Sequence, residues 1–257
     1  MVTKKGPNGE DLTVEQRLQI AKGAGFDSVE PDTIFESAAV QEFKAASEKI
    51  GMPVDAIICS THWSHPLSDP DPQVVEHCMN GMRVSLLNAK DLGGTMVLLV
   101  PAVVKPGVRY EEAWQRSVPK IRELAKDAEK LGIVIGIENV WNKFLLSPLE
   151  AKAYIREIGS PYVKFWFDTG NVLLFGYPQD WIRTLGADIV RMDVKDFKTD
   201  TKEFVPLREG STDWPEVRRA MDEIKYSGYL AAEVQGGDLA YLTEKVSKPM
   251  DLIIEGK

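Results

Sequence analysis

Short apolar runs alternate with amphipathic stretches along the whole chain. The runs have the length and composition of buried strands, and the stretches between them repeat apolar residues at the spacing of helices that pack one face on a core. The predicted strands are residues 27–31, 53–59, 95–101, 133–140, 163–169, 188–196 and 229–235. The predicted helices are residues 14–24, 35–50, 72–92, 110–131, 147–158, 178–186, 214–226 and 239–254.

The helix boundaries carry clear signals. Pro72, Ser147-Pro148 and Asp213 stand where helices are expected to start, and a glycine follows most helices just before the next strand, as in "EKIGMP" and "EKLGI". Strands that are apolar on both faces and are joined by helices indicate a parallel sheet covered on both sides.

The number of strand–helix units narrows the fold. The predicted strand ends are Glu30, Cys59, Pro101, Glu138, Asp168, Asp193 and Glu233. That many units in 257 residues indicates a (β/α)8 TIM barrel in a single domain, residues 1–257, rather than a doubly wound sheet. Neither GxGxxG nor GxxxxGK follows a strand, which removes the main signal of a nucleotide-binding sheet.

The first strand of the barrel is expected to be short or missing. Only Val2 and Thr3 precede "KKGPNG", whose composition is typical of a turn. The segments 27–31 and 229–235 would then border a gap with exposed backbone edges. We expect either the N-terminal segment or a second chain in a homodimer to cover that gap.

Composition and charge limit the partners. The chain has 31 Lys and Arg against 39 Asp and Glu, a net charge of −8, which disfavours nucleic acid. No apolar run is long enough to span a membrane, and the first thirteen residues lack the apolar core of a signal peptide. Cys59 and Cys78 form no CxxC motif and are expected to stay reduced, which favours a cytoplasmic protein without excluding an exported one that has lost its signal.

Four consecutive strands end in acids, namely Glu138, Asp168, Asp193 and Glu233. Any one of them taken alone has an ordinary alternative, a helix cap for Asp168 or an ion pair with Arg191 or Lys195 for Asp193. In a barrel, however, these strand ends meet at one mouth, where four carboxylates repel one another unless a cation neutralises them. Oxygen ligands favour one divalent ion, Mn²⁺ or Mg²⁺ before Zn²⁺ or Co²⁺.

These segments resemble a known family. "IENVWNKFLLSP", "FDTGNV", "DVKDF" and "LREGSTDW", in this order, are similar to the sugar phosphate isomerase/epimerase family, the xylose isomerase-like TIM barrels. The resemblance covers about residues 12 to 235 and includes branches of hexulose- and pentulose-phosphate isomerases and epimerases. It implies a divalent metal held by Glu138, Asp168, Asp193 and Glu233. Two positions depart from the family pattern, because Asp193 and Asn171 stand where histidine is usual.

The resemblance also implies a mechanism and a small-molecule carbohydrate substrate. Glu138 and Glu233 would exchange a proton beside the ketone through an enediolate that the metal stabilises. Candidate substrate-binding residues are His62, Trp63, Trp141, Asn171, Lys195 and Arg208. Alternatives stay open for three of them, a packed loop aromatic for Trp141 and a solvated surface cation for Lys195 and Arg208.

Three functions remain open at this point. The first is a metal-dependent isomerase or epimerase of ketoses or ketose phosphates. The second is a lyase that uses the same enediolate, either a dehydratase or a keto-sugar deglycosidase. The third is a barrel that binds a sugar without turnover. Bound metal separates the third function from the others, and the reaction product separates the first from the second.

Overall fold

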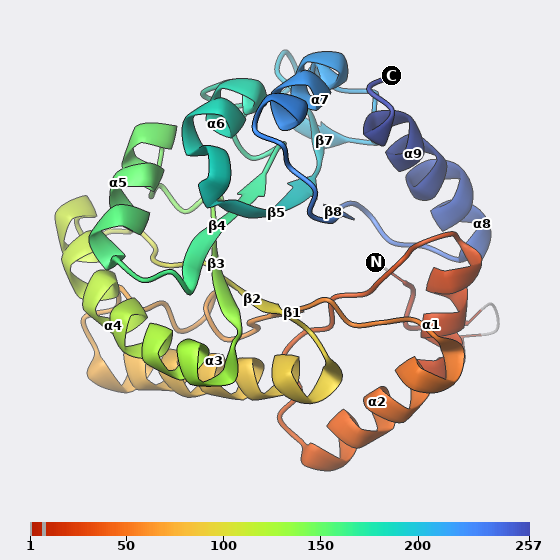
Figure 1. Cartoon of the computed structure of the whole chain (residues 1–257), viewed down its shortest axis with the longest axis horizontal. Helices are drawn as coiled ribbons and strands as arrows, with labels where there is room; N and C mark the ends of the chain where they lie inside the picture. Colours follow the sequence, from red (N-terminus) through yellow and green to blue (C-terminus); the bar gives the residue numbers. More distant parts are fainter. Residues whose placement is uncertain (1, 7–8) are drawn as a thin grey trace.

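The computed structural model describes residues 2–6 and 9–257. Six parallel strands form one curled sheet in the order β1-β2-β3-β4-β5-β8, and helices surround it (Figure 1). The strands are β1 (Ala56–Ile58), β2 (Met96–Leu99), β3 (Val134–Glu138), β4 (Val163–Asp168), β5 (Ile189–Val194) and β8 (Leu230–Ala232). The architecture is that of a TIM barrel, as the alternation of strand and helix patterns predicts.

The helices begin where the sequence signals stand. They are α1 (Val14–Gly23), α2 (Ser37–Ile50), α3 (Pro72–Leu92), α4 (Tyr110–Leu131), α5 (Pro148–Ile158), α6 (Pro178–Leu185) and α7 (Trp214–Glu223). Asp71, Ser147 and Asp213 each accept a hydrogen bond from a backbone N–H of the first turn, which caps α3, α5 and α7. Of the helices in the described part of the chain, none combines the length and apolar character that crossing a membrane requires.

The prediction of a strand at residues 27–31 is wrong in extent. Only two isolated bridges form there, Val29 with Val54 and Asp32 with Ile58. Pro31 lies between them and has no N–H to donate, so the ladder to β1 is interrupted, although Ile58 still donates to the carbonyl of Pro31 at 3.0 Å.

The first strand of the barrel is reduced to a single contact. Val2 forms an isolated parallel bridge with Gly237, and Lys5 pairs with Asp11 in a turn. This agrees with the expectation of a short or missing strand, as far as residues 2–6 and 9–13 are concerned; Met1, Pro7 and Asn8 lie outside the described residues. The N-terminal segment lies between β8 and α1 (Figure 1) and covers part of the border that residues 229–235 form.

The C-terminal half of the barrel departs from the prediction in two places. A hairpin of β6 (Asp196–Lys198) and β7 (Glu203–Val205) follows β5, where no strand pair was expected. The helix predicted at 239–254 is divided into α8 (Leu239–Tyr241), a π-helical segment Leu242–Ser247 and α9 (Lys248–Ile254). Pro249 lacks the N–H of an ordinary α-helical bond at this junction, which fits the change in winding.

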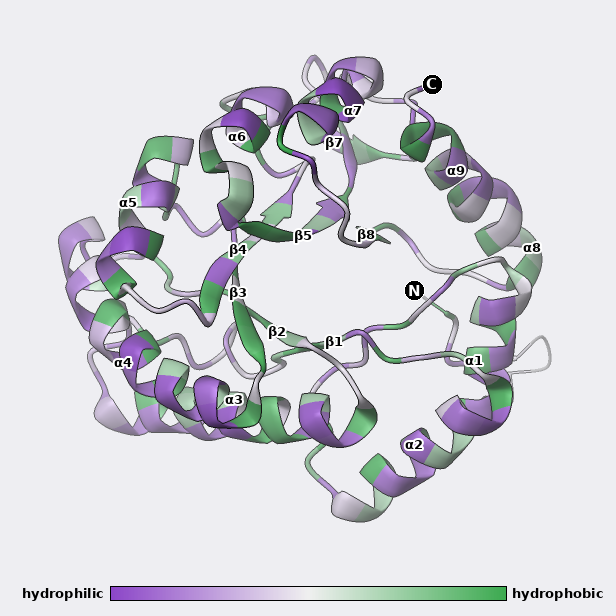
Figure 2. Cartoon of the chain, in the orientation of Figure 1, coloured by the Kyte–Doolittle hydropathy of each residue, from purple (hydrophilic) through white to green (hydrophobic). Residues whose placement is uncertain are grey.

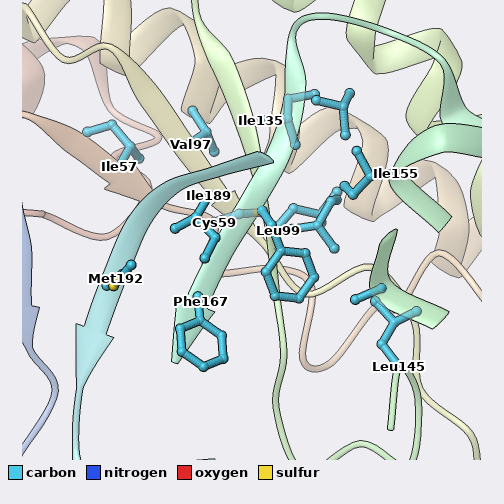
Figure 3. Close-up of a cluster of buried hydrophobic side chains, with 14 of the residues drawn as sticks. Ile57, Cys59, Val97, Leu99, Ile135, Leu145, Ile155, Phe167, Ile189 and Met192 are labelled. Carbon is cyan, nitrogen blue, oxygen red and sulfur yellow. The ribbon is translucent and has the colours of Figure 1, made fainter. Parts of the chain in front are cut away.

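Successive side chains of each strand point alternately toward the helices and toward the barrel interior. Ile135, Phe167 and Met192 point away from the barrel axis into the apolar layer beneath the helices (Figure 3). In Figure 2 hydrophobic residues are concentrated on β3, whereas hydrophobic and hydrophilic residues alternate along the helices. The residues between them, such as Gly136 and Trp166, face the interior, where Trp166 packs with a small separate apolar cluster.

Gly136→Ala is expected to destabilise the fold by about 1–3 kcal/mol, the usual cost of overpacking a core. A Cβ at position 136 would lie 2.9 Å from Cε3 and 3.1 Å from Cβ of Trp166, an indole with no exposed surface. Chemical denaturation measures the loss. In a Trp166→Phe background the same change should cost less; an equal cost in both backgrounds would assign the effect to something other than this contact.

Candidate metal centre and active site

The strand register brings the four acids together at the carboxyl ends of the strands. Glu138 and Asp168 are the last residues of β3 and β4, Asp193 is directly opposite Asp168 on β5, and Glu233 follows β8. One carboxylate oxygen from each acid lies within 4.8 Å of those of the other three. The acids that the sequence places on separate strands therefore form one cluster, which can hold a metal ion.

Burial and mutual repulsion set the protonation of this cluster. Burial, followed by the charges of Asp193, Glu233 and Asp168, raises the pKa of Glu138 well above its usual value. Asp193 behaves in the same way, since burial comes first and the charges of Glu233 and Asp168 add to it, so its pKa is also raised. Glu233 differs in its surroundings, because 53% of its side chain is exposed whereas Glu138 is only 5% exposed.

Lys195 already supplies one positive charge to the cluster. Its Nζ lies 2.7 Å from Oε2 of Glu233 and 3.3 Å from Oδ2 of Asp168. Burial opposes its charge, but Asp168 and Glu233 outweigh burial and raise the pKa of Lys195. For Asp168, burial raises the pKa to about 7 although the charge of Lys195 acts in the opposite direction. The charge of Lys195 therefore offsets part of the negative charge of the four acids.

Two asparagines hold the ends of β3 and β4 in place. Asn139 accepts from the backbone N–H of Asp168 at 2.9 Å and donates to its carbonyl at 3.0 Å. The side chain of Asn171 donates to the carbonyl of Asn139, and its backbone N–H donates to Oδ1 of Asp168 at 2.6 Å. One oxygen of Asp168 is therefore fixed by a backbone N–H in the turn after β4, and the other faces Lys195. The helix-cap alternative for Asp168 is wrong, because the next helix, α6, begins only at Pro178.

The buried oxygens of the cluster show whether a cation fits it. Oδ1 of Asp193 is buried and accepts no hydrogen bond from the described residues, whereas Oδ2 of Asp168, also buried, lies 3.3 Å from Nζ of Lys195. Such oxygens are costly in a dry site unless a cation neutralises them. A set of four carboxylates, in which a buried oxygen of Asp193 has no hydrogen-bond partner among the described residues, suits a hard divalent cation, so the residues present fit the metal that the sequence implies.

The cluster opens into a cavity of about 1090 Å³. Five of the six residues predicted to bind substrate line it, namely His62, Trp63, Trp141, Asn171 and Lys195. His62 is buried, and its Nδ1 accepts from the backbone N–H of Val100 at 3.3 Å, so a neutral imidazole carries its proton on Nε2. Arg208 lies outside the described lining; it is exposed and donates to the carbonyl of Lys257 at 3.1 Å.

The mouth of the cavity carries more aromatic rings than the sequence indicated. Trp141 packs against Phe204 at 4.8 Å between ring centroids and donates from Nε1 to the carbonyl of Asn171. Phe35 and Phe204 line the cavity together with Trp63 and Trp141, and all four are exposed. Phe204 belongs to the unpredicted hairpin, so its position could not be inferred from strand ends.

A buried ion-pair network lies one layer below the acids and was not foreseen. Arg191, two residues before Asp193 on the same face of β5, forms ion pairs with Glu30 and Asp55. Its guanidinium lies 5.4 Å from the ring centroid of Trp166 and 5.2 Å from that of Tyr229. Arg191 is 2% exposed, so its charge acts inside the barrel and not at the surface.

We expect the metal-free protein to lose stability as the pH rises from about 5 to 8. The pKa of Asp168 is about 7 in the fold and 3.8 as a reference, so the folded state binds this proton more tightly. Its contribution is complete below the unfolded pKa and is lost as the pH rises through about 7, and the part lost between pH 5 and pH 8 is about 3 kcal/mol.

Thermal unfolding with a chelator at pH 5 and pH 8 measures this effect. Asp168→Asn should flatten the pH dependence, and Mn²⁺ or Mg²⁺ at pH 8 should recover the loss by binding the folded state only. An identical pH dependence in Asp168→Asn and in the unchanged chain would contradict the assignment.

Comparison with known proteins agrees with this fold. The sequence model of the family described as "Xylose isomerase-like TIM barrel" matches residues 18–254. The chain is 24% identical over 265 residues to the putative L-ribulose-5-phosphate 3-epimerase SgbU of Escherichia coli strain K12, covering 96% of this chain and 90% of that protein. It is 26% identical over 227 residues to the L-ribulose-5-phosphate 3-epimerase UlaE of the same strain, covering 83% and 78%.

Solved structures show the same architecture. A D-psicose 3-epimerase determined in the presence of D-fructose superimposes with a TM-score of 0.77 at 20% identity, covering 96% of this chain and 95% of that one. A xylose isomerase-like TIM barrel protein from Mycobacterium smegmatis, in complex with magnesium, gives 0.73 at 17% identity, covering 98% and 94%. The match over residues 18–254 shows that this chain belongs to the xylose isomerase-like TIM barrel family.

Proposed function

We propose that this protein is a divalent-metal-dependent sugar isomerase or epimerase that moves a proton at the carbon beside a ketone. The observation that carries the proposal is the cluster of four carboxylates, one oxygen of each within 4.8 Å of the others, at the floor of a large cavity. Relatives at 24% and 26% identity are named as 3-epimerases of L-ribulose 5-phosphate, which supports the reaction class.

Glu138 and Glu233 are the proposed proton-transferring residues. They stand at the two ends of the arc β3-β4-β5-β8, with Asp168 and Asp193 between them. A substrate carbon held over the arc would meet one glutamate on each side, which is the arrangement that inverting a stereocentre requires. Their surroundings differ, since Glu138 is buried with a raised pKa and Glu233 is exposed and paired with Lys195.

The four acids are the proposed ligands of one divalent ion, and Mn²⁺ and Mg²⁺ suit an all-carboxylate set best. When bound, the ion would stabilise the negative charge that develops on the substrate oxygens as the proton leaves carbon. Asp168 is held by Asn139 and Asn171, and its second oxygen, which lies 3.3 Å from Nζ of Lys195, would be shared with the ion. Lys195 would share its charge between Glu233, Asp168 and a substrate oxygen nearby.

Exchange of the substrate proton for deuterium tests the proposal. The protein is loaded with Mn²⁺ or Mg²⁺ and incubated with a panel of ketoses in D₂O, and the C3 proton is followed by NMR. We expect metal-dependent loss of that signal together with formation of the epimer or isomer. Elimination of water or of another group would indicate a lyase, and a sugar that binds without exchange would indicate a non-catalytic barrel.

The assembly state stays a prediction. A homodimer would cover the backbone edges beside the shortened first strand, which Val2 covers only in part. Sedimentation equilibrium decides whether the second chain is needed.

A further inference from the structure

The described residues of the cavity wall include four cations, Lys4, Arg17, Arg191 and Lys195, of which the last two are engaged in ion pairs. Lys195 is held between Asp168 and Glu233, and Arg191 between Glu30 and Asp55. Neither can turn toward an anionic ligand without leaving buried acids unpaired, which is expensive.

Acids dominate the rest of the wall. Nine carboxyl side chains line the cavity against the four cations, so even with one divalent ion bound an excess of negative charge remains. Besides the acids of the cluster they are Asp27, Glu30, Asp32, Glu36, Glu42 and Asp251. Like charges repel, so this acidic wall disfavours a ligand that carries a further negative charge.

The mouth of the cavity is lined by aromatic side chains. Phe35, Trp63, Trp141 and Phe204 come from four separate segments and stay 46–58% exposed around the cavity. The indole N–H of Trp141 already donates to the carbonyl of Asn171 at 2.9 Å. Aromatic faces pack well on the C–H groups of a sugar but give a phosphate dianion no hydrogen-bond donor, and its desolvation would be uncompensated.

From this charge distribution we infer that the substrate is an uncharged ketose and not a ketose phosphate. The inference rests on the proposed function and deepens it, because it names the substrate class of the same site. The inferred substrate differs from the 5-phosphate for which the two relatives are named. The cavity binds the sugar by its hydroxyls and C–H faces and repels a terminal phosphate.

The test compares L-ribulose with L-ribulose 5-phosphate, and D-fructose with D-fructose 6-phosphate. C3 proton exchange is measured with the metal-loaded protein in D₂O, and quenching of tryptophan fluorescence gives the affinity independently. We expect kcat/KM to be higher for the free ketose by about tenfold or more, which corresponds to at least about 1.4 kcal/mol of discrimination. Added salt should narrow the difference, because it screens the repulsion.

Arg17→Gln tests whether a wall cation outside these ion pairs holds a phosphate. Arg17 lines the cavity from α1, and its Nε is buried without a hydrogen-bond partner among the described residues. If the inference holds, the ratio of the two kcat/KM values stays the same in this variant. A phosphate ester that is preferred, or is used as well as the free sugar, overturns the inference and leaves the proposed function standing. A selective loss of phosphate-ester turnover in Arg17→Gln overturns it too, whereas no exchange with any ketose removes the proposed function and the inference together.

Discussion

Glu138→Gln and Glu233→Gln are each expected to slow interconversion of the two epimers by about 100-fold or more, as loss of a positioned acid or base usually does. Glutamine keeps the size and one oxygen of glutamate but cannot carry the proton. The two variants should fail differently, because a remaining glutamate can still exchange the proton on its own side. Residual deuterium uptake should therefore be confined to one epimer in Glu138→Gln and to the other in Glu233→Gln.

Metal content must be measured beside activity, because both residues are also proposed ligands. Elemental analysis of each variant after loading separates a lost acid–base group from a lost metal. Glu129→Gln is the matched control, since Glu129 is an exposed acid on α4, outside the cluster. Near-normal epimerisation in either cluster variant would rule out the scheme with two glutamates.

The meeting of the four acids at one mouth was predictable because it depends on strand alternation and strand order. Glu138 and Asp168 end apolar runs, and parallel strands bring such ends to one edge of the sheet. The pairing of Asp193 with Asp168 is seen only in the structure, because the ladder between β4 and β5 shifts its register between Phe165 and Trp166. Residues 27–31 show the limit of pattern reading, because Pro31 within the run already argued against a regular strand.

The ion pairs of the barrel were not predictable, because they join segments far apart in the chain. Lys195 was expected to bind substrate, to be solvated or to pair with Asp193, yet its partners are Asp168 at the end of β4 and Glu233 just after β8. Glu30 and Arg191 are separated by 161 positions and meet only because the sheet curls. Sequence patterns fix which face a side chain occupies, whereas its partner across the barrel depends on closure and twist.

Arg191→Met is expected to lower the free energy of unfolding by about 3–5 kcal/mol, the cost of breaking a buried ion pair from one side. The change leaves Glu30 and Asp55 charged, with side chains only 15% and 10% exposed, beneath a cluster that is itself acidic. Urea denaturation in the presence of a chelator measures the loss without a contribution from metal binding. The matched control adds Glu30→Gln and Asp55→Asn to Arg191→Met, which removes the uncompensated charges and should recover most of the stability. A loss below about 1 kcal/mol in Arg191→Met, the range of an exposed ion pair, would mean that these acids take up protons or water when their partner is removed.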